Sequence, residues 1–435
     1  MRGLFRLLIG FVHFHNVLIA SSQHFYYSKT SINNVVTDGG KIYIGAVNEI
    51  AVLSEDELVP LHSVITGPIN DSVLCSFDGS SCLRNAVLRE TDNYNKVLQV
   101  LPNGVLHCGS VRQGICSMHS LLDLSVMSSG DVPVASISPT ASCVSIVLSP
   151  TRLAVAVSYS GDSPYRDPFP AVAIRELPSY SVLNAGSLEG EAAVFLRAEL
   201  RLSFIVHYLT IFHYEHYVFI AAVQSQDTRQ MRSLPRVSKL LRFCDNDTRF
   251  ISYSEVELQC RSEDNSNFPH MTAAFIHGDY LVGAFTTSPS GTRSAICLFS
   301  MQRLKLIFWY NIDRCRGGTD SIGLPHIGRD AKCLNKSRLP LDEETCELGV
   351  GGSFEADEIA VAEVTVKITS LSGITSPQIL LAGTDDGQIL QGAAESSNCT
   401  GLRGFTSSFY SRQDRKPLRD NITTERISEK EDKAD

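Results

Sequence analysis

Three histidines in one short stretch raise the question of a metal site. They are His207, His213 and His216, between Val206 and Val218. A bound metal needs ligands that converge. Here the histidines alternate with aromatic residues as in a β-hairpin, and histidines beside aromatic residues usually pack against them. We therefore expect no metal site and no other cofactor.

Paired carboxylates could act as general acids and bases, and two groups were considered. Asp342 to Glu344 lie in a polar stretch, whereas catalytic carboxyl groups need burial to separate their pKa values. Asp385 to Gly387 lacks the alternating oxygen ligands of a calcium loop and fits a hairpin turn better. We found no nucleophile elbow, phosphate-binding loop or zinc-protease motif. The sequence thus predicts that the protein is not an enzyme.

Twelve cysteines favour an oxidising compartment, in which disulfides persist. No Cys-x-x-Cys pair and no zinc-finger spacing of Cys and His is present, so disulfides are favoured over zinc. Five sequons for N-glycosylation agree with secretion. Their acceptors are Asn70, Asn246, Asn335, Asn398 and Asn421.

The N-terminus has the order of a signal peptide. Arg2 and Arg6 precede an apolar stretch, Leu7 to Ala20, that ends in small residues. We assign residues 1–22 to a signal peptide, with a buried N-terminal element of a cytosolic protein as the alternative. The formal net charge of -9 and the pI near 5.8 argue against a nucleic-acid partner, which requires a basic face.

Short apolar runs bounded by turn residues predict a mostly β chain. Six runs recur, most of them about 50 to 65 residues apart, which is near the period of propeller blades. They are Lys41 to Val47, Val105 to Ser110, Leu153 to Ser158, Tyr217 to Gln224, Leu281 to Thr287, and Ile379 to Gly383. Small residues within them, such as Gly45, Ala221 and Gly283, allow close approach between strands. A pair of β-sandwiches is the rival architecture, but no linker separates two halves.

Several motifs give the chain a resemblance to the plexin family, over about Tyr26 to Gln391. Cys108-Gly109-Ser110 with Gln113-Gly114 and Cys116 resembles the pattern of plexins, whereas semaphorins usually have Cys-Gly-Thr. The other motifs are Thr66-Gly67-Pro68, Tyr165-Arg166-Asp167 before Pro170-Ala171, Arg236 to Leu240 leading to Cys244, and Gly351-Gly352-Ser353 after Cys346. Val350 stands where the family has Leu. The resemblance implies an all-β, sema-type seven-bladed β-propeller, incomplete here at the last blade.

The resemblance also implies five disulfides on matching cysteines. These are Cys75 with Cys82, Cys108 with Cys116, Cys244 with Cys346, Cys260 with Cys297, and Cys315 with Cys333. Cys143 and Cys399 are left over. We expect Cys143 to be a buried strand thiol, and the pairing of Cys399 stays open.

By the same resemblance, the chain is the ligand-binding module of a semaphorin receptor in semaphorin-plexin signalling, which includes axon guidance. Its expected partner is a semaphorin ectodomain, with a co-receptor and a homodimer left open. Tyr165, Arg166 and Asp167 are candidate ligand contacts because Tyr and Arg are common interface anchors. Arg166 has an equally strong structural alternative, in which it pairs with a carboxylate inside the blade.

After Gln391 the chain departs from the family. We assign 23–391 to the sema domain and 392–435 to a divergent, disordered tail, because Thr424 to Asp435 is a run of mixed charge. The N-terminal strand that completes the last blade is expected within His24 to Ser31. The product is expected at the cell surface as part of a full-length receptor, or secreted as a decoy if complete. The rivals are a sema domain of a growth-factor receptor and a secreted propeller hydrolase.

Overall fold

Strands form nearly all the regular structure of the protein. The computed structural model describes residues 25–161, 163–229, 235–335, 342, 344–375, 378–394 and 402–408. Within this part, α2 (Met301–Arg316) is the single α-helix, and η1 (Arg112–Gly114), η2 (Ala198–Leu200) and η3 (Pro325–Ile327) are short 3-10 turns. The chain divides into two compact units, residues 1–139 with 163–166, and residues 140–162 with 167–435.

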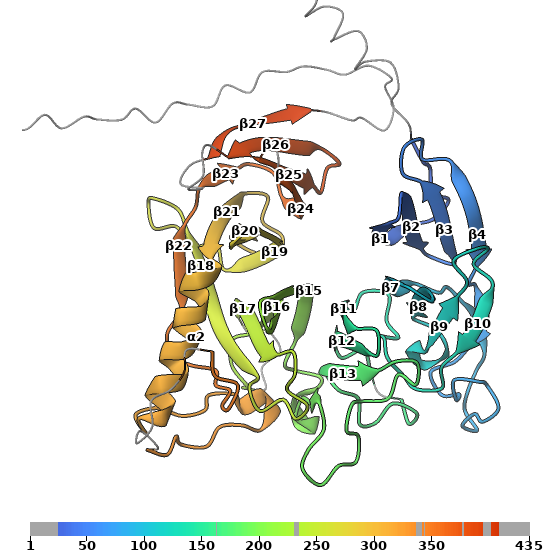
Figure 1. Ribbon diagram of the computed structural model, residues 1–435, viewed down its shortest axis with the longest axis horizontal. Helices are drawn as coiled ribbons and strands as arrows, with labels where there is room; N and C mark the ends of the chain where they lie inside the picture. The colour runs from blue at the N-terminus through green and yellow to red at the C-terminus, as the bar shows by residue number, and fades with distance from the viewer. Residues whose placement is uncertain are drawn as a thin grey trace, which may run out of the picture. The chain divides into compact units, whose positions relative to one another are not determined.

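The first unit contains two four-stranded antiparallel sheets and one small hairpin (Figure 1). The first sheet consists of β1 (Ile32–Asp38), β2 (Lys41–Ala46), β3 (Glu49–Ser54) and β4 (Pro60–Ile65). The second consists of β7 (Asn95–Leu101), β8 (Gly104–Gly109), β9 (Cys116–His119) and β10 (Val126–Ser129). The hairpin pairs β5 (Ile69–Asp71) with β6 (Arg89–Thr91) and brackets the segment between the two sheets.

The second unit contains four sheets, each built on an antiparallel meander. Its first sheet is β11 (Cys143–Ser149), β12 (Arg152–Val157), β13 (Val172–Glu176) and β14 (Ala193–Val194). Its second is β15 (Val206–Tyr214), β16 (Tyr217–Ser225), β17 (Arg236–Cys244) and β18 (Ser254–Arg261), with β22 (Ala356–Ile359) added in parallel to β18. Its third is β19 (His270–His277), β20 (Tyr280–Thr286), β21 (Ser294–Ser300) and β23 (Ala362–Val364). Its fourth is β24 (Ile368–Thr375), β25 (Gln378–Thr384), β26 (Ile389–Ala394) and β27 (Leu402–Ser408).

The six predicted apolar runs correspond to one strand in each sheet, namely β2, β8, β12, β16, β20 and β25. Each is the second strand of its meander. All nine residues of β16 are buried, because a strand covered on both faces has no solvent face to keep polar. Gly45 in β2 allows close packing of this kind, since a Cβ on it would lie 2.2 Å from the side chain of Asn95.

Each sheet is a propeller blade, as the sequence predicts, and six blades are described. The set is one short of seven, in agreement with an incomplete last blade. The prediction of a strand within His24 to Ser31 is wrong for the described residues. Residues 25–31 form no strand, and β1 begins at Ile32. The boundary at Gln391 lies inside β26, which pairs with β27, so the sheet continues past it. Residues 1–22 and 409–435 lie outside the described residues.

The helix α2 belongs to a long insertion between β21 and β22. Leu304, Phe308, Ile312 and Cys315 are its buried residues at helical spacing. Leu304 and Phe308 join the hydrophobic core around β16, whereas Ile312 and Cys315 pack with Cys333 and Val350 of the insertion itself. The helix therefore attaches the insertion to its blade.

Candidate functional site

Ten cysteines form the same five disulfides that the family resemblance implies. The pairs are Cys75–Cys82, Cys108–Cys116, Cys244–Cys346, Cys260–Cys297 and Cys315–Cys333. Two of them, Cys244–Cys346 and Cys315–Cys333, hold the insertion that contains α2. Cys143, at the start of β11, is half-buried rather than fully buried. Cys399 lies outside the described residues.

Three of the five sequons can be placed. Asn70 in β5, Asn246 and Asn335 are exposed, as an attached glycan requires. Asn398 and Asn421 lie outside the described residues. Glycosylation therefore stays a prediction, at three positions with the accessibility that it needs.

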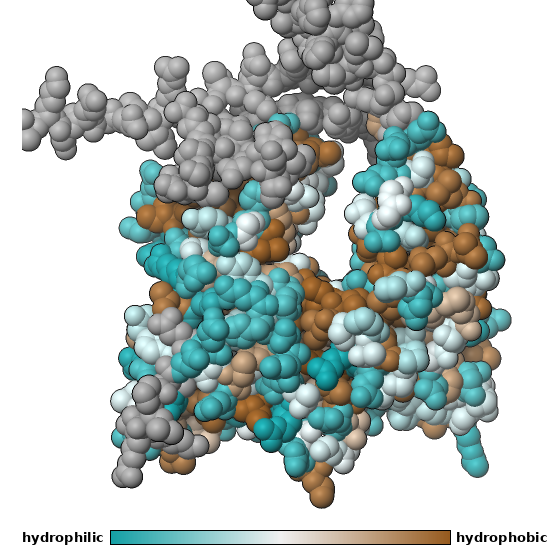
Figure 2. All heavy atoms as spheres, in the orientation of Figure 1, coloured by the Kyte–Doolittle hydropathy of each residue, from teal (hydrophilic) through white to brown (hydrophobic). Residues whose placement is uncertain are grey.

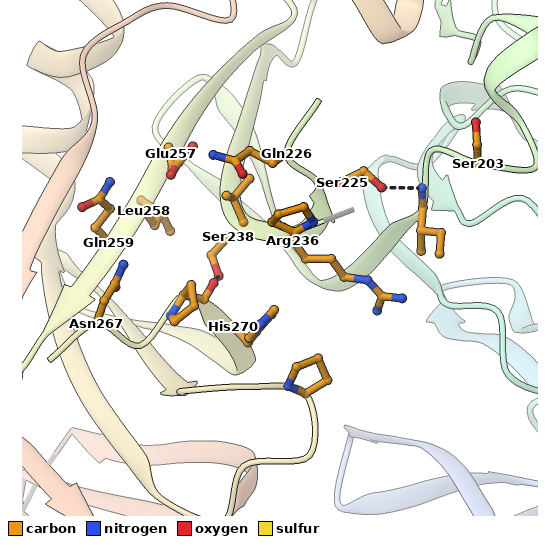
Figure 3. A pocket seen from close by; sticks show the side chains of 15 residues that line it. Ser203, Ser225, Gln226, Arg236, Ser238, Glu257, Leu258, Gln259, Asn267 and His270 are labelled. Atoms are coloured by element: carbon orange, nitrogen blue, oxygen red, sulfur yellow. Dashed lines mark hydrogen bonds between the residues drawn. The ribbon is translucent and has the colours of Figure 1, made fainter. Parts of the chain in front are cut away.

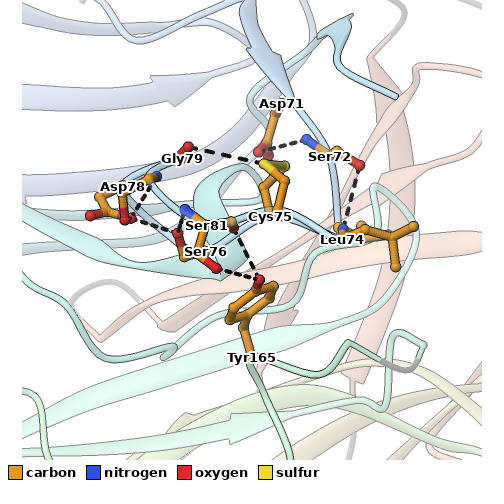
Figure 4. Close-up of a disulfide and its surroundings, with 12 residues drawn as sticks. Asp71, Ser72, Leu74, Cys75, Ser76, Asp78, Gly79, Ser81 and Tyr165 are labelled. Carbon is orange, nitrogen blue, oxygen red and sulfur yellow. Dashed lines mark hydrogen bonds between the residues drawn. A yellow bond between two sulfur atoms is a disulfide. The ribbon is translucent and has the colours of Figure 1, made fainter. Parts of the chain in front are cut away.

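Two of the three predicted ligand contacts, Tyr165 and Arg166, form hydrogen bonds inside the first unit. Figure 4 shows Tyr165 beside the Cys75–Cys82 disulfide. Arg166 is buried and donates a hydrogen bond from Nη1 to the carbonyl oxygen of Gln113. The hydroxyl of Tyr165 donates to the carbonyl oxygen of Ser81, at 3.0 Å, in the loop closed by Cys75–Cys82. Gln113 offers Arg166 a backbone carbonyl as acceptor, whereas the structural alternative expects a carboxylate.

Gln113 is the residue that connects this arrangement. It adopts a left-handed conformation with a φ of 64° and is buried. Its amide nitrogen donates to the carbonyl oxygens of Val73 and Cys75, at 3.1 and 2.5 Å, and its amide oxygen accepts from the hydroxyl of Ser163 at 2.9 Å. From the sequence, Gln113 is recognisable only as part of a motif, because local spacing does not reveal contacts with residues 38 to 50 positions away.

The third predicted contact, Asp167, belongs to the second unit. Its carboxylate is exposed and forms an ion pair with Arg201, at 2.7 Å. An exposed pair of this kind contributes little to stability, so Asp167 is accessible to a ligand. Ligand contact by these three residues stays a prediction.

The segment held by Gln113 and Tyr165 exposes apolar side chains. We call residues 72–88 the Cys75 loop. Val73, Leu83, Val87 and Leu88 on this loop are between 45% and 61% exposed. Backbone hydrogen bonds from Ser76 to Ser81 and from Leu83 to Leu74 hold the loop together. The Cys75 loop is a preorganised surface with aliphatic groups facing solvent, a composition that marks interaction sites.

A second apolar surface of the first unit lies on β4. Leu61 and Ile65 are exposed on this edge strand, as is Val59 just before it. Figure 2 shows brown, apolar atoms interspersed with teal over the strands labelled β3 and β4 in Figure 1. Edge strands have unpaired backbone groups that can bind another chain.

The second unit contains a polar cavity of about 580 Å³, which we call the Arg236 pocket (Figure 3). Its lining comes from β17, β18, the start of β19 and the loops beside them. Arg236 and His270 provide nitrogen atoms, and Gln226 and Asn267 provide amides. Burial and the nearby charge of Arg236 lower the pKa of His270, so its imidazole is neutral at physiological pH.

A buried carboxylate lies on β18, one of the strands that line this pocket. Glu255 on β18 accepts hydrogen bonds from Tyr253, at 2.9 Å, and from the amide of Gln224, at 2.7 Å. His326 of η3 lies 2.9 Å from the same carboxylate. Burial alone would raise the pKa of Glu255, but the charge and hydrogen bond of His326 outweigh it and lower this pKa to about 2. The group is therefore a structural ion, not a proton donor at neutral pH.

The histidine-rich hairpin is β15 and β16. His213 pairs with Asp245 at 2.9 Å, and His216 packs on Tyr217 with 4.0 Å between ring centroids. Among the described residues one group has metal-ligand geometry, Glu215, His216 and Glu344, whose ligand atoms lie within 4.8 Å of one another.

The ammonium group of Lys305 already pairs with both carboxylates of that group, Glu215 and Glu344. The positive charge of Lys305 lowers the attraction of these carboxylates for a second cation. These three residues therefore do not support a metal site.

The acidic turn near the C-terminal end of the described chain is a hairpin turn. Gly387 has a φ of 84° in the turn between β25 and β26, so Asp385 to Gly387 form the predicted hairpin turn. Among the described residues, no helix has the length and apolar character needed to cross a membrane.

No protein-family model matches the chain. Plexin-2 of Caenorhabditis elegans is 50% identical over 357 residues, which are 82% of this chain and 20% of that protein. Plexin-2 of Caenorhabditis briggsae is 45% identical over 387 residues, or 88% of this chain and 21% of that protein. The chain thus spans about a fifth of the length of these curated relatives.

Solved structures share the fold at low sequence identity. The full extracellular region of Plexin A4, domains 1 to 10, has a TM-score of 0.74 and 21% identity, over 86% of this chain and 36% of that chain. A structure of Drosophila Plexin A in complex with Semaphorin 1b has a TM-score of 0.54 and 15% identity, over 88% of this chain and 79% of that chain. These likenesses concern the fold.

Proposed function

The chain belongs to the plexin family, and from this premise we propose that it is the extracellular, semaphorin-binding sema domain of a plexin receptor. The observation that carries the proposal is the 50% identity to a plexin over 82% of the chain. Five disulfides and exposed sequons fit a chain that faces the outside of the cell. A solved complex of a plexin with a semaphorin has the same fold.

The proposed activity is binding without catalysis. The buried carboxylate Glu255 is held ionised by His326, and Lys305 pairs with both carboxylates of the exposed acidic group around His216. The carboxylates of both groups are thus already engaged by a basic side chain of the protein. Blade-edge loops on a rigid scaffold are suited to protein recognition.

We assign the Cys75 loop as one contact surface for the semaphorin. Its aliphatic groups are exposed while its backbone is fixed by a disulfide and by Gln113. A preordered loop loses little entropy on binding, so burying these groups contributes directly to affinity. Tyr165 donates a hydrogen bond to Ser81 of the loop, and Arg166 donates one to Gln113, which holds the loop.

The test is binding of the secreted chain to a panel of semaphorin ectodomains in a biosensor. We expect at least one semaphorin to bind, and Val87→Asp to weaken binding at least tenfold. Leu122→Asp, at an exposed leucine of the first unit outside both apolar surfaces, is the matched control. Absence of binding to every semaphorin, together with binding to a growth-factor ectodomain or cleavage of a glycoside substrate, would overturn the proposal.

A further inference from the structure

The Arg236 pocket has walls that are fixed before any ligand arrives. The hydroxyl of Ser238 donates to the carbonyl oxygen of Pro269, at 2.7 Å, and accepts from the amide of Met271, at 2.8 Å, so β17 is tied to β19. On the other side, the amide of Ile205 donates to the hydroxyl of Ser225 at 3.0 Å. Prolines 235, 269 and 289 line the pocket, and their fixed φ angles further restrict its rim.

Of the two charged residues that line the pocket, Glu257 has an ion-pair partner, whereas Arg236 has none among the described residues. Glu257 pairs with Lys239 at 3.2 Å, and the amide of Gln259 donates to Glu355. Figure 3 shows the guanidinium group of Arg236 without a hydrogen bond to the other residues drawn. Because His270 is neutral, the positive charge of the pocket resides on Arg236.

Together these features favour a carboxylate ligand. The planar guanidinium group matches a carboxylate with two parallel hydrogen bonds. Asn267 and Gln226 are exposed at the pocket and can donate further hydrogen bonds to such a group. The lone positive charge of Arg236 disfavours a metal cation. The volume of about 580 Å³ exceeds that of one acidic side chain and fits the tip of a loop.

We propose that the Arg236 pocket binds an aspartate or glutamate side chain on a protruding loop of the partner protein. The inference rests on the proposed semaphorin binding and identifies a second contact of that partner. Arginine is enriched among the residues that dominate binding energy at interfaces. Semaphorins that present an acidic loop tip are then bound more tightly than those that present a basic one.

The first experiment measures affinity of the secreted full chain for a semaphorin that binds the wild type. We expect Arg236→Ala to raise Kd at least tenfold and Arg236→Glu to raise it further. Arg236→Lys should give an intermediate Kd, because lysine keeps the charge but cannot form the two parallel hydrogen bonds of a guanidinium group. Arg229→Ala is the matched control, since Arg229 lies in the same hairpin but is paired with Asp227. The proposed role of the pocket is refuted if Arg236→Ala has the melting temperature of the wild type and a Kd within twofold of the wild-type value. The proposal that the chain binds semaphorin would still stand in that case.

The second experiment does not depend on semaphorin. N-acetyl-glutamate is titrated into the wild-type chain while the ring signals of His270, assigned with His270→Gln, are followed by NMR. We expect a shift that saturates in the wild type and is absent in Arg236→Ala. No shift overturns the carboxylate site. Saturation by inorganic phosphate at a tenfold lower concentration also overturns it, because the pocket is then a small-anion site.

Discussion

The Nε2 atom of His326 lies 2.9 Å from Oε1 of Glu255, and both side chains are buried. His326 comes from η3 in the insertion, whereas Glu255 lies on β18 of the blade. The ring of Phe204 stacks on His326 with 4.7 Å between centroids. This pair therefore fixes the insertion to the sheet that lines the Arg236 pocket.

Removal of His326 is expected to destabilise the fold strongly. His326→Leu leaves Glu255 buried with less compensation, and breaking one partner of a buried pair costs about 3 to 5 kcal/mol. Urea unfolding monitored by fluorescence measures this change. Glu199→Gln is the control, because the ion pair of Glu199 with Arg197 is exposed and contributes little to stability. Equal costs for the two variants would contradict the structural role of the pair.

Acid is expected to destabilise the first unit through His107. Burial, with a smaller contribution from the charge of His119, lowers the pKa of His107 to about 3. The folded state therefore holds a neutral imidazole, whereas the unfolded chain takes up a proton below its ordinary pKa of about 6.5. Stability is thus lost as the pH falls from about 6.5 to 3, and the loss at pH 4.5 is on the order of 3 kcal/mol.

The measurement is the free energy of unfolding between pH 7.5 and pH 4.5. His107→Leu should flatten this dependence, since no imidazole remains to be protonated on unfolding. His62→Leu, at an exposed histidine of β4, is the control and should leave the slope unchanged. A slope that is identical in all three proteins would show that the imidazole of His107 is not the responsible group.

Part of this architecture was predictable from the sequence and part was not. The apolar strands such as β16 were found because burial on both faces leaves a continuous apolar run. The disulfides were placed by family resemblance, since spacing alone does not pair Cys244 with a cysteine 102 residues away. The edge strands were missed. β4, for example, has the burial pattern of an exposed segment, so its residues carry little periodic signal.

The site was less predictable than the fold because its contacts are distant in sequence. The sequence motif singles out Tyr165 and Arg166 as candidate ligand contacts, but it does not reveal their partners Ser81 and Gln113, which lie 84 and 53 residues away. The Arg236 pocket joins segments from Ser203 to Pro289. A cavity of this kind arises from the packing of strands and leaves no local motif.

The guanidinium group of Arg242 is expected to stabilise the fold through its packing and not through its charge. It lies between the rings of Tyr217 and Phe308, at 4.3 and 4.5 Å, and joins β17 to α2. Its Nε and Nη1 atoms are buried without a hydrogen bond among the described residues, which offsets the cation–π attraction. Arg242→Met should therefore change the free energy of unfolding by about 1 kcal/mol or less.

Arg242→Ala is the comparison that makes this test decisive. It removes the packing between the two rings and should cost about 2 to 4 kcal/mol. Chemical unfolding of the two variants and the wild type measures both effects. If the methionine variant loses as much stability as the alanine variant, the charge of Arg242 is required after all.

Arg166 is expected to act on stability and only indirectly on ligand binding. Arg166→Ala leaves the carbonyl oxygen of Gln113 without this donor in a buried position, at a cost of about 1 to 3 kcal/mol. Tyr165→Phe removes the hydrogen bond to Ser81 and should cost about 0.5 to 1.5 kcal/mol. Thermal unfolding gives both values. Arg84→Ala, an exposed arginine of the Cys75 loop, serves as the control for stability.

The same variants separate a supporting residue from a contact residue. At a temperature where Arg166→Ala is folded, its affinity for semaphorin should stay within about threefold of the wild type, because the side chain is buried and faces the protein interior. Val87→Asp should show the opposite behaviour, with unchanged stability and weakened binding, since Val87 faces solvent. If Arg166→Ala loses affinity without losing stability, Arg166 contacts the ligand directly and its structural role is refuted.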